Sequence, residues 1–518
     1  MFDFETNEVE SERKLGNVIS LLLPARSYRL YCSWTQEAPL PAIEEFSCRL
    51  LLALGEVLPG ELQEYFGLTT RECEVLVQSL TDNKLATYTS EGLLSPSSML
   101  QTKTNGNADV LPSLTKYEEK EENPVFDLLT LTILSRRSYD KSKYGLPEIP
   151  VTEEKSLSQL EILEAFGKQY RAHLEYTRKN EIDIKKTRLY KISTCEQDRT
   201  LQIPIDLDIH VETTPNGRVN VIKDSSEKLG DLRRRPLSNK LESKISDYLN
   251  SLQMPSGGLS LEEYCHIVDD KILLRYASNN SFDLNSWLLD RAEKKTGYGN
   301  PQTRAMLGPI YLDNNRVLLE RLLKDNSRDW KPKTIHSALW LSSFAPLWGE
   351  NGSLLGEFSR KIEPLLAEDE SVKGNIVALF PFNDYKGVAE LKRRFGTRIP
   401  SAVCFGGDLL QDRSEIFLIP GQVAISQFHI HPSPDSSITI PIGFITTDVE
   451  RLTRIHSILS YRLENRPPPQ LAWTNGKMSA SELLRFALHD EEQSEGEAPK
   501  RQNETVIYYK PKPKRISE

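Results

Sequence analysis

The sequence predicts a multidomain protein of mixed α/β and α+β class. Its 518 residues exceed what one hydrophobic core usually organises. Over residues 374–463, short apolar runs bounded by Gly, Pro and Asp alternate with helical segments, which is typical of an α/β unit. Helix and strand patterns are mixed through the middle of the chain. We therefore expect an N-terminal domain at 1–100, a linker at 101–124, a mixed α+β middle domain at 125–365, a C-terminal α/β unit at 366–466, and a linker, short helix and mobile tail at 467–518.

The composition limits the function classes. Lys and Arg number 65 against 74 Asp and Glu, so the net charge is −9. A protein whose whole surface binds nucleic acid is usually basic, so any nucleic-acid contact is expected from a local patch. No run of about 18 apolar residues is present, and the N-terminus is acidic where a signal peptide is basic and then apolar. We expect a cytoplasmic protein without a membrane partner.

The six cysteines argue against a zinc or redox centre. They stand at positions 32, 48, 73, 195, 265 and 404, and no two have the close spacing of a zinc knuckle or a redox pair. The sequence therefore predicts reduced, mostly buried thiols, and no cofactor.

Residues 42–100 carry the clearest local pattern. A short helix from Pro59 is stopped by Gly67, and Thr69 or Thr70 can cap the next helix. Two short strands, at 84–89 and 93–95, follow and are joined by a turn that ends at Gly92. Helix, helix, turn, helix and a two-stranded wing in this order resemble the winged helix-turn-helix fold.

That resemblance implies a role for the third helix, residues 71–83. In the family this helix enters the DNA major groove. Here it offers Arg71 against three acidic residues, and carboxylates repel phosphates. Arg71 and Gln78, with Asn83, are the candidate contacts to base edges. The alternative is a module that docks a protein partner.

A second basic group lies in the middle of the chain. Arg233, Arg234 and Arg235 precede Lys240, and such clusters contact phosphates. The alternative is a solvated loop and helix start, with Pro236 in the first turn. Further cations that can extend a basic stripe are Arg136, Arg137, Lys185, Lys186 and Arg188, and the basic end at residues 510–515 is another candidate.

One strand pattern places metal-ligand types together. Residues 205–212 alternate between apolar and polar side chains, so Asp206, Asp208, His210 and Glu212 share one face. Carboxylate oxygens and an imidazole can hold Mg²⁺ or Mn²⁺. A solvated polar face on an antiparallel strand gives the same alternation.

The two histidines His429 and His431 introduce another resemblance. Phospholipase D-like phosphodiesterases carry His-x-Lys, four residues, Asp, six residues and Gly-Ser-x-Asn. In that family the histidine attacks phosphorus and the lysine neutralises phosphoryl oxygens. His431 can replace a lysine only when protonated. The positions that match this spacing are His429, His431, Ser436 and Gly443, and Phe444 and Thr446 stand in the serine and asparagine places.

This resemblance covers about 90 residues, near 374–464, in a degenerate form. The alternative is a Rossmann-like or mixed sheet that carries a chance histidine pair. We expect a non-enzymatic DNA-binding or adaptor subunit of a multiprotein assembly, by analogy one of bacterial DNA processing or antiviral defence. DNA and protein partners are expected. The alternatives are a phosphodiesterase or nuclease that uses His429 and His431, and a metal-dependent enzyme built on Asp206, Asp208 and His210.

Overall fold

The computed structural model describes residues 13–488 except 109–112, 135–144, 152–157, 179–183, 215, 229–233, 254–257, 279–280, 327–336, 367–373, 383–384, 407–412, 434–435, 465–467 and 477. The chain forms two compact units. Unit 1 comprises Met1–Met254, Pro346–Leu354 and His431–Ile440, and unit 2 comprises Pro255–Ala345, Leu355–Ile430 and Pro441–Glu518. The mixed α/β and multidomain class expected from the sequence is confirmed. In the described residues, no helix is both long and apolar enough to cross a membrane.

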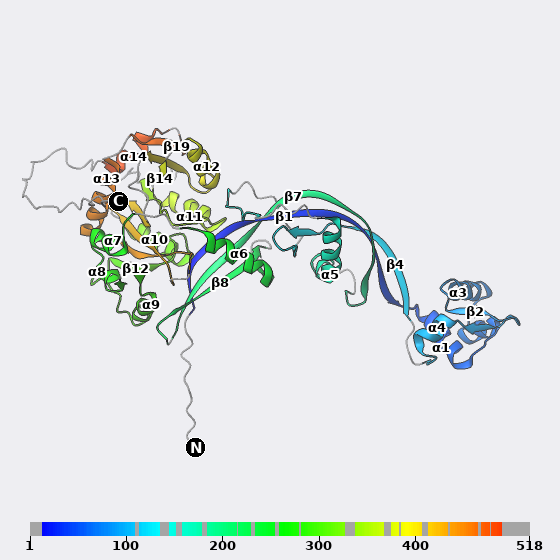
Figure 1. Cartoon of the computed structure of the whole chain (residues 1–518). Helices are drawn as coiled ribbons and strands as arrows, with labels where there is room; N and C mark the ends of the chain where they lie inside the picture. The colour runs from blue at the N-terminus through cyan, green and yellow to red at the C-terminus, as the bar shows by residue number, and fades with distance from the viewer. Residues whose placement is uncertain are drawn as a thin grey trace, which may run out of the picture. The chain divides into compact units, whose positions relative to one another are not determined.

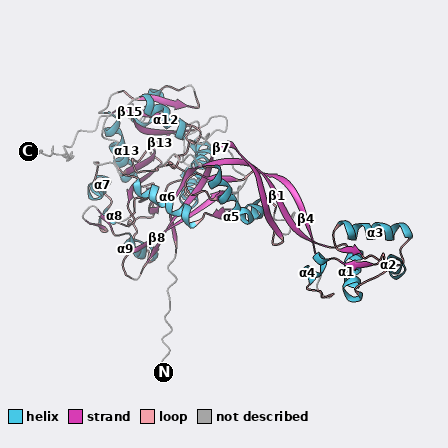
Figure 2. Ribbon diagram, turned by 45° about the vertical axis from the view of Figure 1, so that its right-hand side comes forward, coloured by secondary structure: helices cyan, strands magenta, loops and turns pink. Residues whose placement is uncertain are grey.

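Unit 1 is built on an antiparallel sheet, seven-stranded within the described residues, in the order β6–β5–β1–β7–β8–β9 with β4 also paired to β1 (Figure 1). Two of its strands are exceptionally long and run together from Lys14↔Val211 to Gln36↔Thr187, twisting as they go (Figure 2). Four register shifts interrupt this pairing, and such bulges increase the local twist. The strands are β1 (Lys14–Pro39), β4 (Ser113–Glu122), β5 (Val125–Asp127), β6 (Ile133–Leu134), β7 (Thr187–Thr213), β8 (Val219–Lys228) and β9 (Arg234–Pro236).

Helix α5 (Gln159–Thr177) covers one face of this sheet. It begins at Ser158, whose hydroxyl accepts from the Glu161 backbone while the Glu161 carboxylate accepts from the Ser158 backbone, so the sequence itself starts the helix there. Its apolar side packs on β1. The residues of this core include Tyr28, Leu30, Cys32 and Trp34 of β1 and Ile162, Phe166, Tyr170 and Leu174 of α5. Helix α6 (Asn239–Ser251) also belongs to unit 1.

The segment between β1 and β4, residues 42–104, forms a small helical module with a hairpin. Its core includes Cys48, Leu51, Leu62, Leu76 and Leu80. The elements are α1 (Ala42–Leu54), α2 (Pro59–Phe66), α3 (Thr70–Asp82), β2 (Ala86–Tyr88), β3 (Leu94–Pro96) and α4 (Ser98–Thr104), and an isolated bridge joins Val57 to Leu94. The expected order of helices, turn and wing is thus confirmed.

Unit 2 is organised around a mixed sheet, eight-stranded within the described residues, in the order β12–β18–β17–β16–β13–β14–β15–β19. The pairs β13–β14 and β14–β15 are parallel, whereas β16 pairs antiparallel with both β13 and β17. The strands are β12 (Thr303–Leu307), β13 (Ser337–Leu341), β14 (Asn375–Phe382), β15 (Ser401–Gly406), β16 (Ser414–Ile419), β17 (Val423–Ile430), β18 (Ile440–Thr446) and β19 (Gln470–Thr474).

The helices that accompany this sheet include α12 and α13, which fall where the sequence predicted helices. A two-stranded ribbon of β10 (Ala277–Ser278) and β11 (Ser281–Phe282) lies among them in the chain. The helices are α7 (Leu261–Val268), α8 (Lys271–Leu274), α9 (Leu284–Ala292), α10 (Asp313–Asn326), α11 (Leu354–Ile362), the 3₁₀ helix η3 (Glu363–Leu366), α12 (Tyr385–Phe395), α13 (Val449–Glu464) and α14 (Ala480–Leu488).

The structure differs from several expected boundaries. Residues 14–39, assigned to the N-terminal domain, form β1 and pair with β7. In place of the linker expected over 101–124, the chain completes α4 and then forms β4, whose charged side chains are tolerated because the strand has an exposed face. The boundary expected at 365/366 crosses the sheet of unit 2, since β12 and β13 precede it. Strand β19 lies in the part expected to be a linker, helix and tail, and the basic end at 510–515 lies outside the described residues.

Candidate functional site

The exposed face of α3 is the surface that the sequence proposed for DNA. Arg71 and Gln78 are both exposed and are seven residues apart, so they share one side of the helix. Glu74 and Asp82 lie on that same side, and the Gln78 amide donates to the Asp82 carboxylate at 2.7 Å. The proposed base contact is therefore already bonded within the helix.

The remaining acidic residue of α3, Glu72, caps the start of the helix. The Glu72 carboxylate accepts from both the backbone and the hydroxyl of Thr69, each at 2.8 Å, and completes a capping box. These hydrogen bonds lower the pKa of Glu72. The carboxylate stays ionised at the helix start, where the helix dipole favours negative charge.

The charge of the whole module also opposes DNA binding. Residues 42–104 contain nine Asp and Glu against four Lys and Arg, a net charge of −5. Neutralisation of phosphates by cations provides most of the affinity of a protein for DNA. A module with this balance repels a phosphate backbone unless the few cations gather on one face.

Helix α1 instead presents apolar side chains to solvent. Ile43, Phe46, Leu50 and Leu54 follow a spacing of three, four and four residues, so they form one stripe along the helix, in which Leu50 is half-buried against the core of the module and the other three are exposed. Phe46 is 54% exposed and Leu54 is 64% exposed, although both are large apolar residues. The Arg49 guanidinium lies over the Phe46 ring, 5.7 Å from its centroid. This α1 stripe is a surface of the kind that marks protein–protein contact sites.

The other predicted phosphate contacts form a separate group. Arg234 and Arg235 lie in β9, where they pair with Lys228 and Glu227 of β8. Lys240 is exposed in the first turn of α6. Arg233, Arg136 and Arg137 lie outside the described residues.

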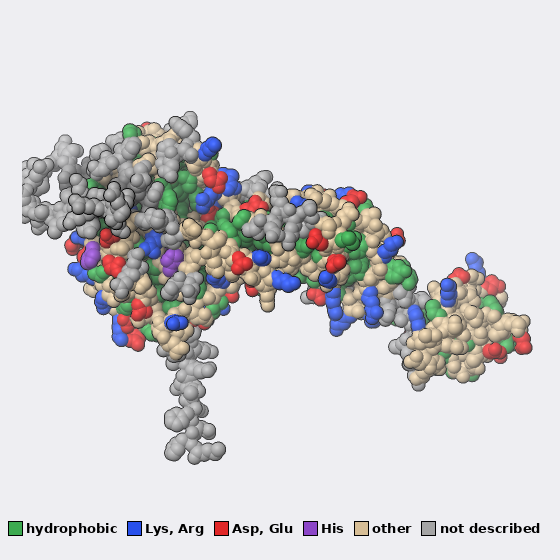
Figure 3. Space-filling model, viewed as in Figure 1, with side chains coloured by type: hydrophobic (Ala, Val, Ile, Leu, Met, Phe, Trp, Pro, Cys, Tyr) green, Lys and Arg blue, Asp and Glu red, His purple; other side chains and the backbone are tan. Residues whose placement is uncertain are grey.

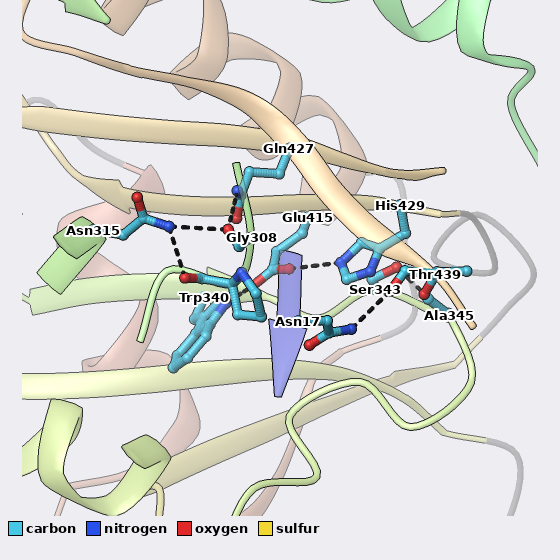
Figure 4. Close-up of polar contacts among 11 residues, drawn as sticks. Asn17, Gly308, Asn315, Trp340, Ser343, Ala345, Glu415, Gln427, His429 and Thr439 are labelled. Carbon is cyan, nitrogen blue, oxygen red and sulfur yellow. Dashed lines mark hydrogen bonds and ion pairs between the residues drawn. The ribbon is translucent and has the colours of Figure 1, made fainter. Parts of the chain in front are cut away.

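In unit 2, His429 belongs to a buried polar cluster (Figure 4). The Glu415 carboxylate accepts from the Trp340 indole at 2.7 Å, and its other oxygen lies 2.8 Å from Nε2 of His429. All three side chains are buried, and His429 is only 4% exposed. Because the carboxylate accepts, the proton of a neutral His429 sits on Nε2 and leaves Nδ1 as an acceptor. Nδ1 has no hydrogen-bond partner among the described residues.

Gln427 extends this cluster along β17. Its amide nitrogen donates to the Gly308 carbonyl at 2.9 Å, and Asn315 donates to the same carbonyl (Figure 4). The Gln427 carbonyl oxygen has no partner within the described part of the chain. The register places Glu415 opposite Gln427, so the polar side chains of β16 and β17 share one face of the sheet.

The remaining positions of the phospholipase D-like spacing have structural contacts of their own. His431 Nδ1 lies 2.7 Å from the Ser436 carbonyl, and the Ser436 hydroxyl donates to the Ile438 carbonyl at 3.3 Å. A Cβ on Gly443 would overlap the Ser426 carbonyl oxygen, so the packing of β18 beside β17 requires a glycine there. Phe444 is fully buried and contacts the Tyr298 ring at 5.5 Å.

The proposed metal face on β7 also has local contacts. Asp206 is buried and accepts from the Ser20 hydroxyl at 2.6 Å. His210 Nδ1 lies 3.4 Å from an Asp224 oxygen. Among the described residues, no group of three or more His, Cys, Asp or Glu side chains is arranged to hold a metal ion.

Sequence reasoning missed Trp340 and Glu415. Glu415 is separated from His429 by 14 residues, and a hairpin of two apolar strands was the only signal available for their pairing. Trp340 comes from β13, and only the order of strands in the sheet brings it to Glu415.

Comparison with known proteins adds little. No family model matches the sequence, and no curated protein matches it. The chain aligns with a solved structure of TrmBL2, described as an archaeal chromatin protein with a novel mode of DNA binding. The alignment covers 83% of this chain and 94% of that one at 9% identity, with a TM-score of 0.20. A likeness at that TM-score supports no conclusion about fold or function.

Proposed function

We propose that this chain is a non-enzymatic adaptor whose 42–104 module binds a partner protein through the α1 stripe. The observation that carries the proposal is the exposure of Phe46 and Leu54 on a module whose net charge is −5. Burial of exposed apolar side chains on association is favourable and is a main driving force for protein interfaces. The acidic surroundings favour a partner segment that is apolar on one side and basic at its rim.

The test starts with a photo-crosslinking amino acid at Leu54, and separately at Val75 on α3 as the matched control. Both positions are exposed apolar residues of the same module. A protein crosslinked from Leu54 is then purified and its affinity is measured for the wild-type chain and for the double variant Phe46→Ser/Leu54→Ser. We expect at least about a tenfold loss of affinity, because truncation of an interface anchor removes about 1.4 kcal/mol or more. Arg71→Glu/Gln78→Ala is expected to bind that partner as the wild type does.

Two results would overturn this proposal. One is equal crosslinking from both positions with no loss in the double variant. The other is duplex DNA binding that falls steeply with salt and disappears in Arg71→Glu/Gln78→Ala, since this would assign α3 to DNA.

A second candidate is the phosphodiesterase or nuclease that uses His429. The favouring observation is the oriented imidazole, held by Glu415 at Nε2 and unbonded at Nδ1 among the described residues. At 4% exposure, the ring meets a phosphodiester only if the surrounding structure opens. The test is hydrolysis of bis(p-nitrophenyl) phosphate by the wild type and by His429→Ala. Activity that His429→Ala removes without unfolding the protein would support an enzyme and contradict the adaptor proposal.

A further inference from the structure

The part of unit 1 next to the module has an open sheet face with aromatic and basic side chains. There β1 lies between β4 and β7, and the register defines rows of side chains across the three strands. Tyr117, Thr35 and Arg188 form one row, and Glu119, Ser33 and Lys191 form the next. Tyr190 falls between these rows, where the register of β7 shifts.

Two tyrosine side chains on this face are exposed to solvent and contact each other. The rings of Tyr117 and Tyr190 meet edge to face with their centroids 5.6 Å apart. They are 65% and 66% exposed, and Tyr31 adds a third exposed ring on the same side of β1. Helix α5 packs against the opposite face, where Trp34 and Cys32 are buried. The three rings therefore lie on the uncovered side of the sheet.

Cations concentrate on β7 at this place. Between residues 184 and 195 the chain carries Lys185, Lys186, Arg188 and Lys191 and no carboxylate. All four are exposed, and Lys and Arg side chains gather along the lower side of this part of unit 1 in Figure 3. We call Tyr31, Tyr117, Tyr190, Lys185, Lys186, Arg188 and Lys191 the β7 patch.

The neighbouring carboxylates of β4 are largely engaged by other groups. Glu121 pairs with the Arg29 guanidinium at 3.4 Å, and its hydrogen bond with Tyr31 raises the pKa of that phenol. Glu119 accepts from the Ser33 hydroxyl at 3.4 Å. The four cations of the β7 patch outnumber Glu119 and Glu121, so the patch is a local positive region on a chain whose net charge is −9.

Protection of a free strand edge explains the cations of the β7 patch but not its exposed tyrosines. In this stretch β7 has β1 on one side and no strand on the other within the described residues, and lysines commonly prevent such edges from pairing. That need is met by the cations alone and gives no reason for three exposed tyrosines. Exposed aromatic rings between cations are the arrangement on which single-stranded nucleic acid stacks its bases while cations meet its phosphates.

We propose that the β7 patch binds single-stranded nucleic acid. In this proposal the bases stack on Tyr117 and Tyr190. The phosphate backbone of the strand is contacted by Lys185, Lys186, Arg188 and Lys191. This site lies on β1, β4 and β7 and not on α3, so it is independent of the adaptor role of the module.

The probe is a fluorescein-labelled dT20 strand, titrated with the full-length chain by anisotropy from 25 to 200 mM salt. The first variant is Arg188→Glu/Lys191→Glu, and the second is Tyr117→Ser/Tyr190→Ser, which leaves the charge unchanged. The matched control is Lys168→Glu/Arg171→Glu, with the same charge change at exposed positions of α5. A labelled 20-base-pair duplex gives the comparison ligand. Circular dichroism establishes that each variant is folded.

We expect dT20 binding that weakens with salt with a logarithmic slope of about −3, from about four phosphate contacts. Each patch variant is expected to bind about tenfold or more weakly, and the tyrosine variant tests stacking separately from charge. The α5 control is expected to change affinity less than about threefold. Equal losses in the patch and control variants, a preference for the duplex, or no dT20 binding at 25 mM salt would each overturn the proposal. Loss only on Arg71→Glu would overturn it as well, by moving the site to α3.

Discussion

Replacement of Glu415 by alanine tests whether the polar cluster of unit 2 is a closed structural element. The carboxylate is the acceptor for both Trp340 Nε1 and His429 Nε2, and all three groups are buried. Its removal leaves two buried donors unsatisfied, at about 1–3 kcal/mol each. We therefore expect unit 2 to lose about 3–5 kcal/mol of stability, the range found when one partner of a buried pair is removed.

Glu415→Gln should be milder, because the glutamine retains the volume and one acceptor. The amide oxygen can accept from Trp340, while neutral His429 can move its proton to Nδ1 and accept from the amide nitrogen at Nε2. One buried N–H on His429 then remains without a partner, and a loss of about 1–2 kcal/mol follows. The order of the two variants is thus part of the prediction.

The assay is hydrogen exchange of peptides from β16 and β17 over a urea series. It is preferred to a single melting curve because a chain of two units need not unfold in one step. The control is Glu450→Ala, at an exposed position in the first turn of α13, where we expect less than about 1 kcal/mol. If Glu415→Ala matched this control, the two donors would be reaching water, and the cluster would be open enough for chemistry at His429.

Three further results are expected. Burial raises the pKa of Cys48 to about 12, so Ellman's reagent at pH 8 should label this thiol only as fast as unit 1 opens. Gly443→Ala should lower the stability of unit 2 by about 3 kcal/mol or prevent folding, measured by thermal denaturation, because its methyl group would overlap the Ser426 carbonyl. Glu122→Ala should increase hydrogen exchange in α5, since the buried Arg178 loses its carboxylate 2.5 Å away, at about 3–5 kcal/mol.

Each of these results has a control. Labelling of native protein that is faster than hydrogen exchange in α1 would contradict the cysteine prediction. Gly297→Ala should be nearly neutral, because no atom lies within 4 Å of the added methyl group, and equal stability of the two alanine variants would refute the steric argument. Glu118→Ala, at an exposed position on the same strand as Glu122, should leave exchange in α5 unchanged.

The elements that the sequence predicted well are those whose signals are local. The Thr69 cap, the Gly67 stop and the Gly92 turn each act within a few residues, and the helices and hairpin of the module follow from them. Each of these contacts joins residues that are close in the sequence and needs no tertiary partner.

The long strand β1 was not predictable in the same way. Its sequence contains two short apolar runs, separated by Pro24 and by polar residues such as Ser27. Pairing with β7, more than 150 residues further along, decides that the whole of Lys14–Pro39 is one strand. The sequence indicated only scattered cations in the β7 patch, because Tyr117 of β4 reaches Tyr190 of β7 across β1, which pairs with both strands. The histidine spacing gave no indication of Glu415 on the adjacent strand, whose carboxylate is the hydrogen-bond partner of His429.

The pairing at the outer end of β1 has a consequence for how the chain can be rebuilt. Pro39 and Ser113 are cross-strand partners, which places their Cα atoms about 5 Å apart. The chain therefore leaves the sheet after Pro39 and re-enters it at Ser113, beside the same point, with the 42–104 module between the two. A turn of two to four residues can join the two ends and leave β1 and β4 as an ordinary hairpin. The module can thus be deleted, moved to another protein or exchanged by changing only the connection between β1 and β4.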